Sequence, residues 1–346
     1  MLGQSQQGRV LALANLTLAS LRNQQGRTAE ILQPARAAEA YYRPNGYVFE
    51  ADLSTLLIGR AQRDEEKWQD ALQTANGLIA LADQSGRNGL LVTSEDLEGT
   101  IYIAMEDYPG ALGHYQIAIS RALDNGTKSF EAAHCADAFV RLGQFSDAKR
   151  MLGLAPPSST LAAEISVESL LAQLKFESAS QSADMFIGKF PGMSFGRKRN
   201  IKLDQAIAEA ATGRTAKARQ GLQSLLAPDG LPRDEDGKPL APDDLAAFEL
   251  AAARIDLADG DAKAALGQAT RAESYFESKH LLDSELRSSL VAAQAASKLN
   301  ETATYKQFSE KSVDIHSELS HTWPSPEFNS YVSRPDLKSQ LREIVR

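Results

Sequence analysis

The sequence predicts an all-α fold: a right-handed α-solenoid of about eight helical hairpins with a C-terminal capping helix. Three observations lead to this prediction: abundant Ala and Leu, small residues that recur at nearly regular spacing, and few strand patterns. Ala and Leu are strong helix formers, and small side chains let helices cross closely. A chain of 346 residues exceeds what one conventional core usually serves. A row of hairpins accommodates this length because its core grows with each repeat.

The clearest hairpin spans residues 51–83. A hairpin of this kind needs a small residue where its two helices cross, then a polar turn. An aromatic residue at the start of the second helix and an Ala three residues later complete it. These features are supplied in order by Gly59, the turn at 64–67, Trp68 and Ala71.

Seven further hairpins follow the same pattern, and their equivalent second-helix positions can be compared. With the clearest hairpin, these positions are Ile31, Ala71, Ala111, Ala148, Ala179, Ala218, Ala265 and Tyr305. Subtracting successive numbers gives spacings of 40, 40, 37, 31, 39, 47 and 40 residues. A non-repetitive helical bundle is the alternative. Helix periodicity alone, however, would not make a turn residue and a small residue recur together.

The helical pattern is interrupted most strongly at residues 227–244, which are rich in Pro, Gly and Asp. Such a composition is typical of a surface loop or a flexible linker. We therefore expect helical repeats at 1–226, a loop or linker at 227–244, and helical repeats with a C-terminal cap at 245–346. Residues 41–49 resemble a β-hairpin, but the helical patterns on both sides favour a loop between repeats.

The C-terminal region should close the row of hairpins. A last helix is expected near Pro335, because proline suits the first turn of a helix. Exposed hairpin ends need a cap with one polar face. The charged segment 338–346 fits that role, and Trp323, Phe328 and Tyr331 are expected to cover the apolar end.

Net charge and cysteine content exclude several classes of function. The formal net charge of −8 argues against nucleic acid as a partner. Cys135 is the single cysteine, so an internal disulfide is impossible. Residues 1–8 lack the basic start of a signal peptide, and the apolar stretch 10–21 is too short to span a bilayer. We expect a cytoplasmic protein without membrane insertion. Because the chain opens almost directly inside a helical pattern, it could be a piece of a longer protein.

No pattern in the sequence predicts catalysis, a cofactor or a metal site. Five histidines are present, without an HExxH pattern. His134 and Cys135 are neighbours, and neighbours on a helix point about 100° apart, which makes them poor joint ligands. No glycine-rich phosphate loop follows a strand. The protein is therefore expected not to be an enzyme.

Two groups of residues are the candidates for contact with a partner. Residues 190–199 form an apolar and then basic loop in an acidic protein. Within it, Phe195, Arg197, Lys198 and Arg199 could dock an acidic peptide or domain. The alternative is that the phenylalanines pack inward and the charges cap a helix. Arg60 and Arg63, on one face of a predicted helix, are the second group.

The second to fourth hairpins resemble the tetratricopeptide repeat superfamily. The runs 66–71 and 106–111 match the entry signature of its second helix. The segment 328–337 is similar to the end of repeat regions in bacterial multidomain signalling proteins. The Lys and Asn pairs by which one subset of the superfamily grips a C-terminal carboxylate are missing, which argues against that mode.

This resemblance implies a binding function. The first helices of stacked hairpins line a concave face, where an extended peptide or a partner helix can lie. The expected function is a non-catalytic scaffold for a protein or peptide. The alternative is a ligand-sensing regulatory domain detached from a bacterial kinase or transcription regulator. Neither the partner nor the oligomeric state can be inferred from the residues.

Overall fold

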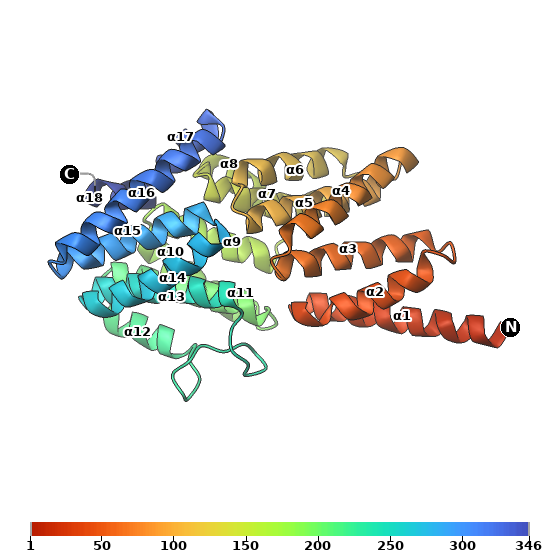
Figure 1. Cartoon of the computed structure of the whole chain (residues 1–346), viewed down its shortest axis with the longest axis horizontal. Coiled ribbons are helices and arrows are strands. Elements are labelled where there is room, and N and C mark those ends of the chain that lie inside the picture. The colour runs from red at the N-terminus through yellow and green to blue at the C-terminus, as the bar shows by residue number, and fades with distance from the viewer. Residues whose placement is uncertain (1, 345–346) are drawn as a thin grey trace. The chain divides into compact units, whose positions relative to one another are not determined.

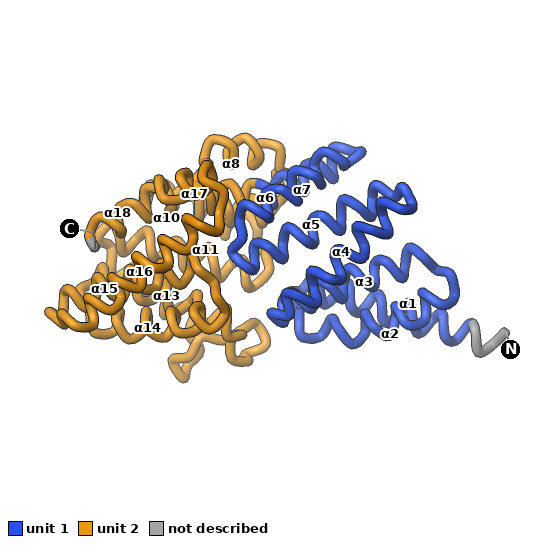
Figure 2. Tube along the Cα trace, turned by 45° about the horizontal axis from the view of Figure 1, so that its top comes forward, with its two compact units in different colours: residues 1–135 blue, residues 136–346 orange. Residues whose placement is uncertain are grey.

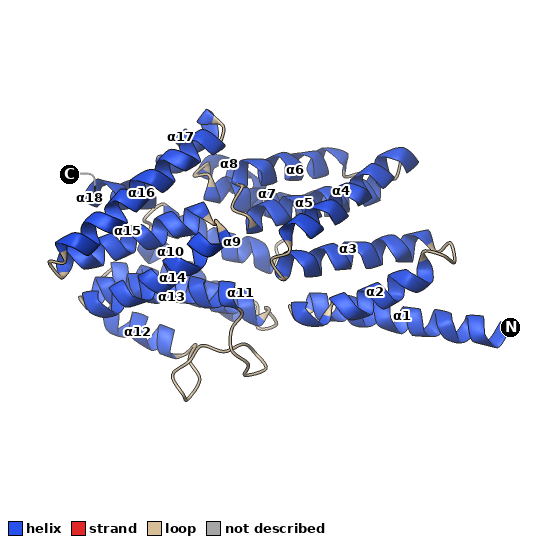
Figure 3. Cartoon of the chain, viewed as in Figure 1, coloured by secondary structure: helices blue, strands red, loops and turns tan. Residues whose placement is uncertain are grey.

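The computed structural model describes residues 2–344, and in this range it contains eighteen α-helices and no strand (Figures 1 and 3). Helices α1 to α16 form eight consecutive hairpins. The first four are α1 (Leu2–Gln24) with α2 (Leu32–Tyr42), α3 (Val48–Asp64) with α4 (Trp68–Ser85), α5 (Asn88–Ala104) with α6 (Tyr108–Arg121), and α7 (Asn125–Arg141) with α8 (Phe145–Leu152). The last four are α9 (Thr160–Ala172) with α10 (Phe176–Lys189), α11 (Phe195–Ala211) with α12 (Thr215–Gln223), α13 (Pro242–Asp259) with α14 (Ala262–Lys279), and α15 (Leu282–Lys298) with α16 (Thr302–Thr322). The all-α prediction and the number of hairpins are confirmed.

The chain divides into two compact units, residues 1–135 and residues 136–346, with the division inside α7 (Figure 2). In each unit, helices pack mainly against their neighbours in sequence. None of the helices in the described range is both long and apolar enough to cross a bilayer.

Every hairpin turns in the same way. One residue near the end of the first helix has a positive φ, between 58° and 90°. These residues are Gly26, Glu66, Glu106, Gly143, Leu174, Gly213, Gly260 and Asn300. The amide that follows each of them donates to a carbonyl five residues earlier, as in Lys67 N–H to Gln62 O at 2.9 Å. This left-handed closure satisfies the free carbonyls at the helix end and reverses the chain.

The residue five positions after each left-handed residue is the one that the sequence pattern aligned. Seven of these eight positions hold Ala or Ile with no exposed surface. Tyr305, in the last hairpin, is partly buried. The repeat alignment is therefore confirmed at the level of single residues.

A close helix crossing in unit 1 depends on Gly99 of α5. A Cβ atom built on Gly99 would lie 2.5 Å from Cε1 and 2.8 Å from Cδ1 of the buried Tyr115 ring of α6. The absent side chain of Gly99 thus makes room for the tyrosine. Gly59 of α3 plays the same part for Leu97, whose Cδ2 atom would stand 2.6 Å from the added Cβ.

Residues 224–241 are free of helix and form the long loop between α12 and α13 (Figure 3). Two isolated β-bridges, Leu226 with Pro232 and Arg233 with Pro239, fold it back on itself. The loop lies inside unit 2, and Pro242 begins α13 behind it. The predicted division of the chain into parts before and after residues 227–244 stays a prediction.

Two short helices, α17 (Ser325–Val332) and α18 (Pro335–Ile344), end the described chain. The rings of Trp323 and Tyr331 are buried and meet edge to face, and the Tyr331 hydroxyl donates to Asp283 Oδ1 at 2.5 Å. Helix α18 packs against α15 and α9. The capping helix thus lies across first helices of unit 2.

A buried ion-pair network fixes the start of α18. Asp336 Oδ2 accepts from Nη1 of Arg287 and from Nη2 of Arg334, both at 3.0 Å. Arg334 also donates through Nη1 to the carbonyl of Arg141 at 2.8 Å. Burial alone would raise the pKa of Asp336, but Arg334 and Arg287 outweigh it and hold the pKa well below its usual value.

Replacing Gly99 with Ala should lower the free energy of unfolding by about 1–3 kcal/mol, because the added methyl group meets the Tyr115 ring. Gly113, on α6, provides a matched control, since a Cβ there would meet no atom within 4 Å. Gly113→Ala should instead add up to about 1 kcal/mol through helix propensity. Urea titration of both variants measures the difference, and equal effects would contradict the close crossing.

Asp336→Asn should remove about 3–5 kcal/mol of stability at pH 7, because it leaves the buried Arg334 guanidinium without its carboxylate and takes one of two carboxylates from Arg287. The folded-state pKa of Asp336 is depressed. Its contribution is therefore complete above the unfolded pKa of about 4, and is lost as pH falls through the folded value.

Urea titrations at pH 7 and pH 3 should accordingly show a smaller difference between wild type and Asp336→Asn at the lower pH. Asp314→Asn, at an exposed position on α16, is the control and should change stability by less than about 0.5 kcal/mol at both pH values. An Asp336→Asn effect as small as that of the control would contradict the network.

Candidate functional site

The structure brings the predicted partner-binding residues to two different places. In unit 1, Arg60 Nη2 lies 3.7 Å from Asp96 Oδ2, and Arg63 is paired with Asp64 at 2.7 Å. In unit 2, Phe195, Lys198 and Arg199 begin α11 and line a cavity of about 380 Å³. The loop at 233–237 forms its other wall.

The two predicted arginines of unit 2 also have acidic partners. Arg199 is buried, and both of its terminal nitrogens donate to the carboxylate of Asp244, at the start of α13. Arg197 Nη1 lies 3.9 Å from Glu164 Oε2. Phe195 and Lys198 line the cavity. Partner binding by all six residues stays a prediction.

A larger cavity of about 450 Å³ lies among the helices of unit 2, and we call it the inner cavity. One wall is apolar and includes Phe176, Ile207 and Val291. Helix α18 contributes Ser339 and Gln340 to another wall. The inner cavity therefore joins an apolar surface to a polar one.

A second cavity of about 310 Å³, the charged cavity, adjoins the inner cavity. Ile207, Arg254 and Asp336 line both of them. Glu164, Glu168 and Asp204 stand on its α9 and α11 side. Arg254 of α13 and Arg287 of α15 line the opposite side of the cavity. The charged cavity therefore presents both acidic and basic groups.

Arg254 is the group common to both cavities that can accept a ligand. Among the described residues, none lies within hydrogen-bond or ion-pair distance of its guanidinium group. Burial lowers the pKa of Arg254, and the nearby charge of Arg287 adds to that effect. Asp336 is already held by Arg334 and Arg287. A carboxylate or phosphate entering either cavity would meet an available guanidinium.

The carboxyl groups opposite Arg254 are poorly solvated. Burial raises the pKa of Glu164 to about 7, against the opposing effects of Arg197 and of a hydrogen bond from Asn200 Nδ2 at 2.8 Å. Burial also raises the pKa of Asp204 well above its usual value, and Glu168 adds to the shift. A cationic group placed here would stabilise their charged forms.

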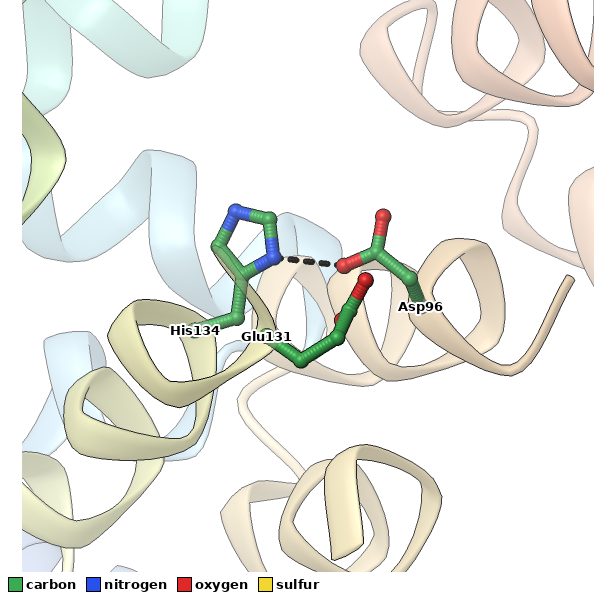
Figure 4. Close-up of side chains that lie close together, drawn as sticks. All are labelled: Asp96, Glu131 and His134. Carbon is green, nitrogen blue, oxygen red and sulfur yellow. Dashed lines mark hydrogen bonds and ion pairs between the residues drawn. The ribbon is translucent and has the colours of Figure 1, made fainter. Parts of the chain in front are cut away.

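Unit 1 contains a different constellation, which we call the Asp96 cluster: Asp96 of α5 with Glu131 and His134 of α7 (Figure 4). His134 Nδ1 lies 2.5 Å from Asp96 Oδ1. Burial would raise the pKa of Asp96, but His134 outweighs it and the pKa is lowered. Burial, and then the charge of Asp96, raise the pKa of Glu131 to about 9.

A second group of this kind joins His114 of α6 to Glu95 and Glu98 of α5, on either side of Asp96 in sequence. His114 Nδ1 is 2.7 Å from Glu95 Oε2, and its Nε2 is 3.8 Å from Glu98 Oε1. Burial would lower the pKa of His114, but the hydrogen bond to Glu95 outweighs it and the pKa is raised. In the Asp96 cluster, one ligand atom from each residue lies within 4.8 Å of the other two. The group of His114, Glu95 and Glu98 does not meet this condition.

Neither Arg254 nor the Asp96 cluster is predicted from the sequence. For the cluster, a signal was present: Glu131 and His134 are three residues apart, which places them on one face of a helix. His134 was instead compared with Cys135, its neighbour in sequence. For Arg254 no such signal exists, because its lack of a partner depends on the packing of α13 among other helices.

No protein-family model and no curated protein sequence matches the chain. Among solved structures, a tetratricopeptide repeat protein from Parabacteroides merdae ATCC 43184 aligns with 13% identity and a TM-score of 0.49, over 80% of this chain and 98% of that chain. A Rap protein complexed with competence and sporulation factor aligns with 14% identity and a TM-score of 0.48, over 95% and 87%. The apo form of RapI aligns with 12% identity and a TM-score of 0.39, over 96% and 84%.

With TM-scores below 0.5, these likenesses assign neither a family nor a function. The chain resembles tetratricopeptide repeat proteins through its own features, namely eight hairpins, one recurring turn and small residues at the crossings.

Proposed function

We propose that this chain is a non-catalytic scaffold that binds a protein or peptide segment in the two adjoining cavities of unit 2. The observation that carries the proposal is Arg254, a charged group that lines both cavities and lacks a partner among the described residues. Arg254 is partly buried, so its charge is incompletely solvated, and a bound anionic group would offset that cost.

The surroundings of Arg254 favour a peptide over a simple anion. The apolar wall of the inner cavity offers Phe176 and Val291 to an apolar side chain. The carboxyl groups of Glu168 and Asp204 in the charged cavity would pair with a cationic side chain. A short segment that carries an acidic group between an apolar and a basic residue would satisfy all three surfaces.

The runner-up is a ligand-sensing regulatory domain of a larger signalling protein. The volume of the inner cavity, about 450 Å³, falls within the range usual for small-molecule sites. A small carboxylic acid with an apolar body would use Arg254 and the apolar wall but leave the charged cavity unused. Dependence of binding on Asp204 therefore separates the two functions.

The loop residues predicted from the sequence remain part of the proposal as a second contact surface. Phe195 and Lys198 border the cavity of about 380 Å³ next to the loop at 233–237. Arg199 would act there indirectly, since its pairing with Asp244 holds α11 against α13. In unit 1, Arg60 and Arg63 are candidates for further contacts.

Peptides selected from a random library on the full chain should bind Arg254→Gln at least tenfold more weakly than wild type. The reason is that hydrogen bonds to a charged group contribute about 1.5–3 kcal/mol, which corresponds to roughly 10- to 150-fold in Kd. Fluorescence anisotropy of labelled peptides measures the change. Asp204→Asn should weaken peptides that carry a basic residue.

Arg271→Gln is the matched control, because Arg271 lies on α14, lines neither cavity and is largely exposed. Its Kd should stay within twofold of wild type. Selected peptides that bind all variants equally would refute the proposed site. Selective binding of small carboxylic acids, unaffected by Asp204→Asn, would favour the sensing domain instead.

A further inference from the structure

The Asp96 cluster in unit 1 brings together three side chains of the kind that bind metal ions. Its three candidate ligand atoms, one from each residue, all lie within 4.8 Å of one another. They come from two helices, since Asp96 belongs to α5 while Glu131 and His134 project from one face of α7 (Figure 4). One nitrogen and two carboxylate oxygens form a donor set that suits Zn²⁺ and related ions.

The position of His134 is fixed by its surroundings. Its ring packs on Tyr115 at a centroid distance of 5.6 Å and meets Phe130 edge to face at 4.9 Å. Tyr115 is itself held over Gly99, one turn after Asp96 on α5. The crossing that shapes the hairpin therefore also orients the imidazole, as the shell around a metal site must.

Glu131 provides an independent indication of a missing ligand. Its side chain is directed at Asp96 (Figure 4). Only 2% of Glu131 is exposed, and no hydrogen-bond donor of the described residues reaches its Oε2 atom. An unsatisfied buried carboxylate oxygen is costly, and either a proton or a cation would relieve it.

The charges around the cluster are also unbalanced. Asp96 on α5 and Glu131 on α7 are both buried carboxyl groups, and they lie next to each other (Figure 4). Arg60 Nη2 lies 3.7 Å from Asp96 Oδ2, and His134 is neutral unless it takes up a proton. A divalent cation would compensate both carboxylate charges at once.

We propose that Asp96, Glu131 and His134 bind a divalent transition-metal ion such as Zn²⁺ and so tie α5 to α7. Binding replaces the hydrogen bond between His134 and Asp96. The imidazole changes tautomer through solvent, so that Nε2 carries the proton and Nδ1 coordinates, and the proton of Glu131 leaves to solvent. Ions can enter beside the His134 side chain, which is 16% exposed, whereas the carboxylates are almost covered.

The competing occupant is a proton. With its pKa raised to about 9, Glu131 is protonated at neutral pH and can donate to Asp96. This state needs no metal, so the experiment must separate a proton-sharing pair from a metal site. Glu131→Gln does so, because the amide retains the shape and a donor but is a poor metal ligand.

Isothermal titration of the metal-free full chain with Zn²⁺ at pH 7 should show one saturable site. Glu131→Gln and His134→Gln should each weaken it at least tenfold. Co²⁺ should give visible absorption bands of a low-coordinate site in wild type, and those bands should disappear in both variants. Circular dichroism establishes that the variants remain folded.

Glu98→Gln is the matched control, since Glu98 is buried on the same helix and faces His114 but lies outside the cluster. It should leave zinc affinity within threefold of wild type. Absence of saturable binding would overturn the proposal in favour of the shared proton. Equal zinc affinity in Glu131→Gln, His134→Gln and wild type would also overturn it, because the ion would then sit elsewhere.

Discussion

The left-handed turn residue that closes the first helix of each hairpin is the constraint on which the rest of the structure depends. At all eight turns a positive φ combines with a hydrogen bond from the next amide to a carbonyl five residues back. Glycine holds four of these positions, whereas Glu66, Glu106, Leu174 and Asn300 hold the others at a cost of about 1–2 kcal/mol each. The turn determines where the second helix begins, and therefore which of its residues lies at the crossing with the first helix. Packing at that crossing offsets the cost of the strained turn.

That fixed offset explains why so much of the fold could be predicted. An Ala or Ile five residues after the turn residue is a local pattern, and it identified seven crossings with fully buried residues. Leu174 has no turn preference, yet Ala179 follows it at the same offset of five residues and marks its hairpin. The exception, Tyr305, belongs to the last hairpin, where its ring lines the inner cavity instead of filling a helix crossing.

The sites could not be predicted in the same way, because they depend on helices that are distant in sequence. Asp96 and His134 are 38 residues apart, and only the packing of α5 near α7 brings them together. Arg199 was predicted to contact a partner from its charged neighbours in sequence. Its pairing depends on a distant residue, because the long loop returns Asp244 to its side, 45 residues later. Only the pair of Glu131 and His134 left a local trace.

Buried charge is distributed unevenly between the two helices of each hairpin. Among the described residues, every buried acidic side chain except Glu273 lies on the first helix of a hairpin or on α18. Second helices contribute mainly small apolar residues to the core. Replacing buried ion pairs with well-packed apolar groups is often neutral or stabilising, so a fold under selection for stability alone would not need this arrangement. Among these carboxyl groups, Asp96 and Glu131 belong to the Asp96 cluster, and Asp283 and Asp336 line the charged cavity. Asp52, Glu209 and Glu285 are paired instead with Arg87, Lys217 and Lys311 of neighbouring elements. The buried charge of the first helices therefore does two things: part of it holds neighbouring helices together, and part of it lines the proposed sites.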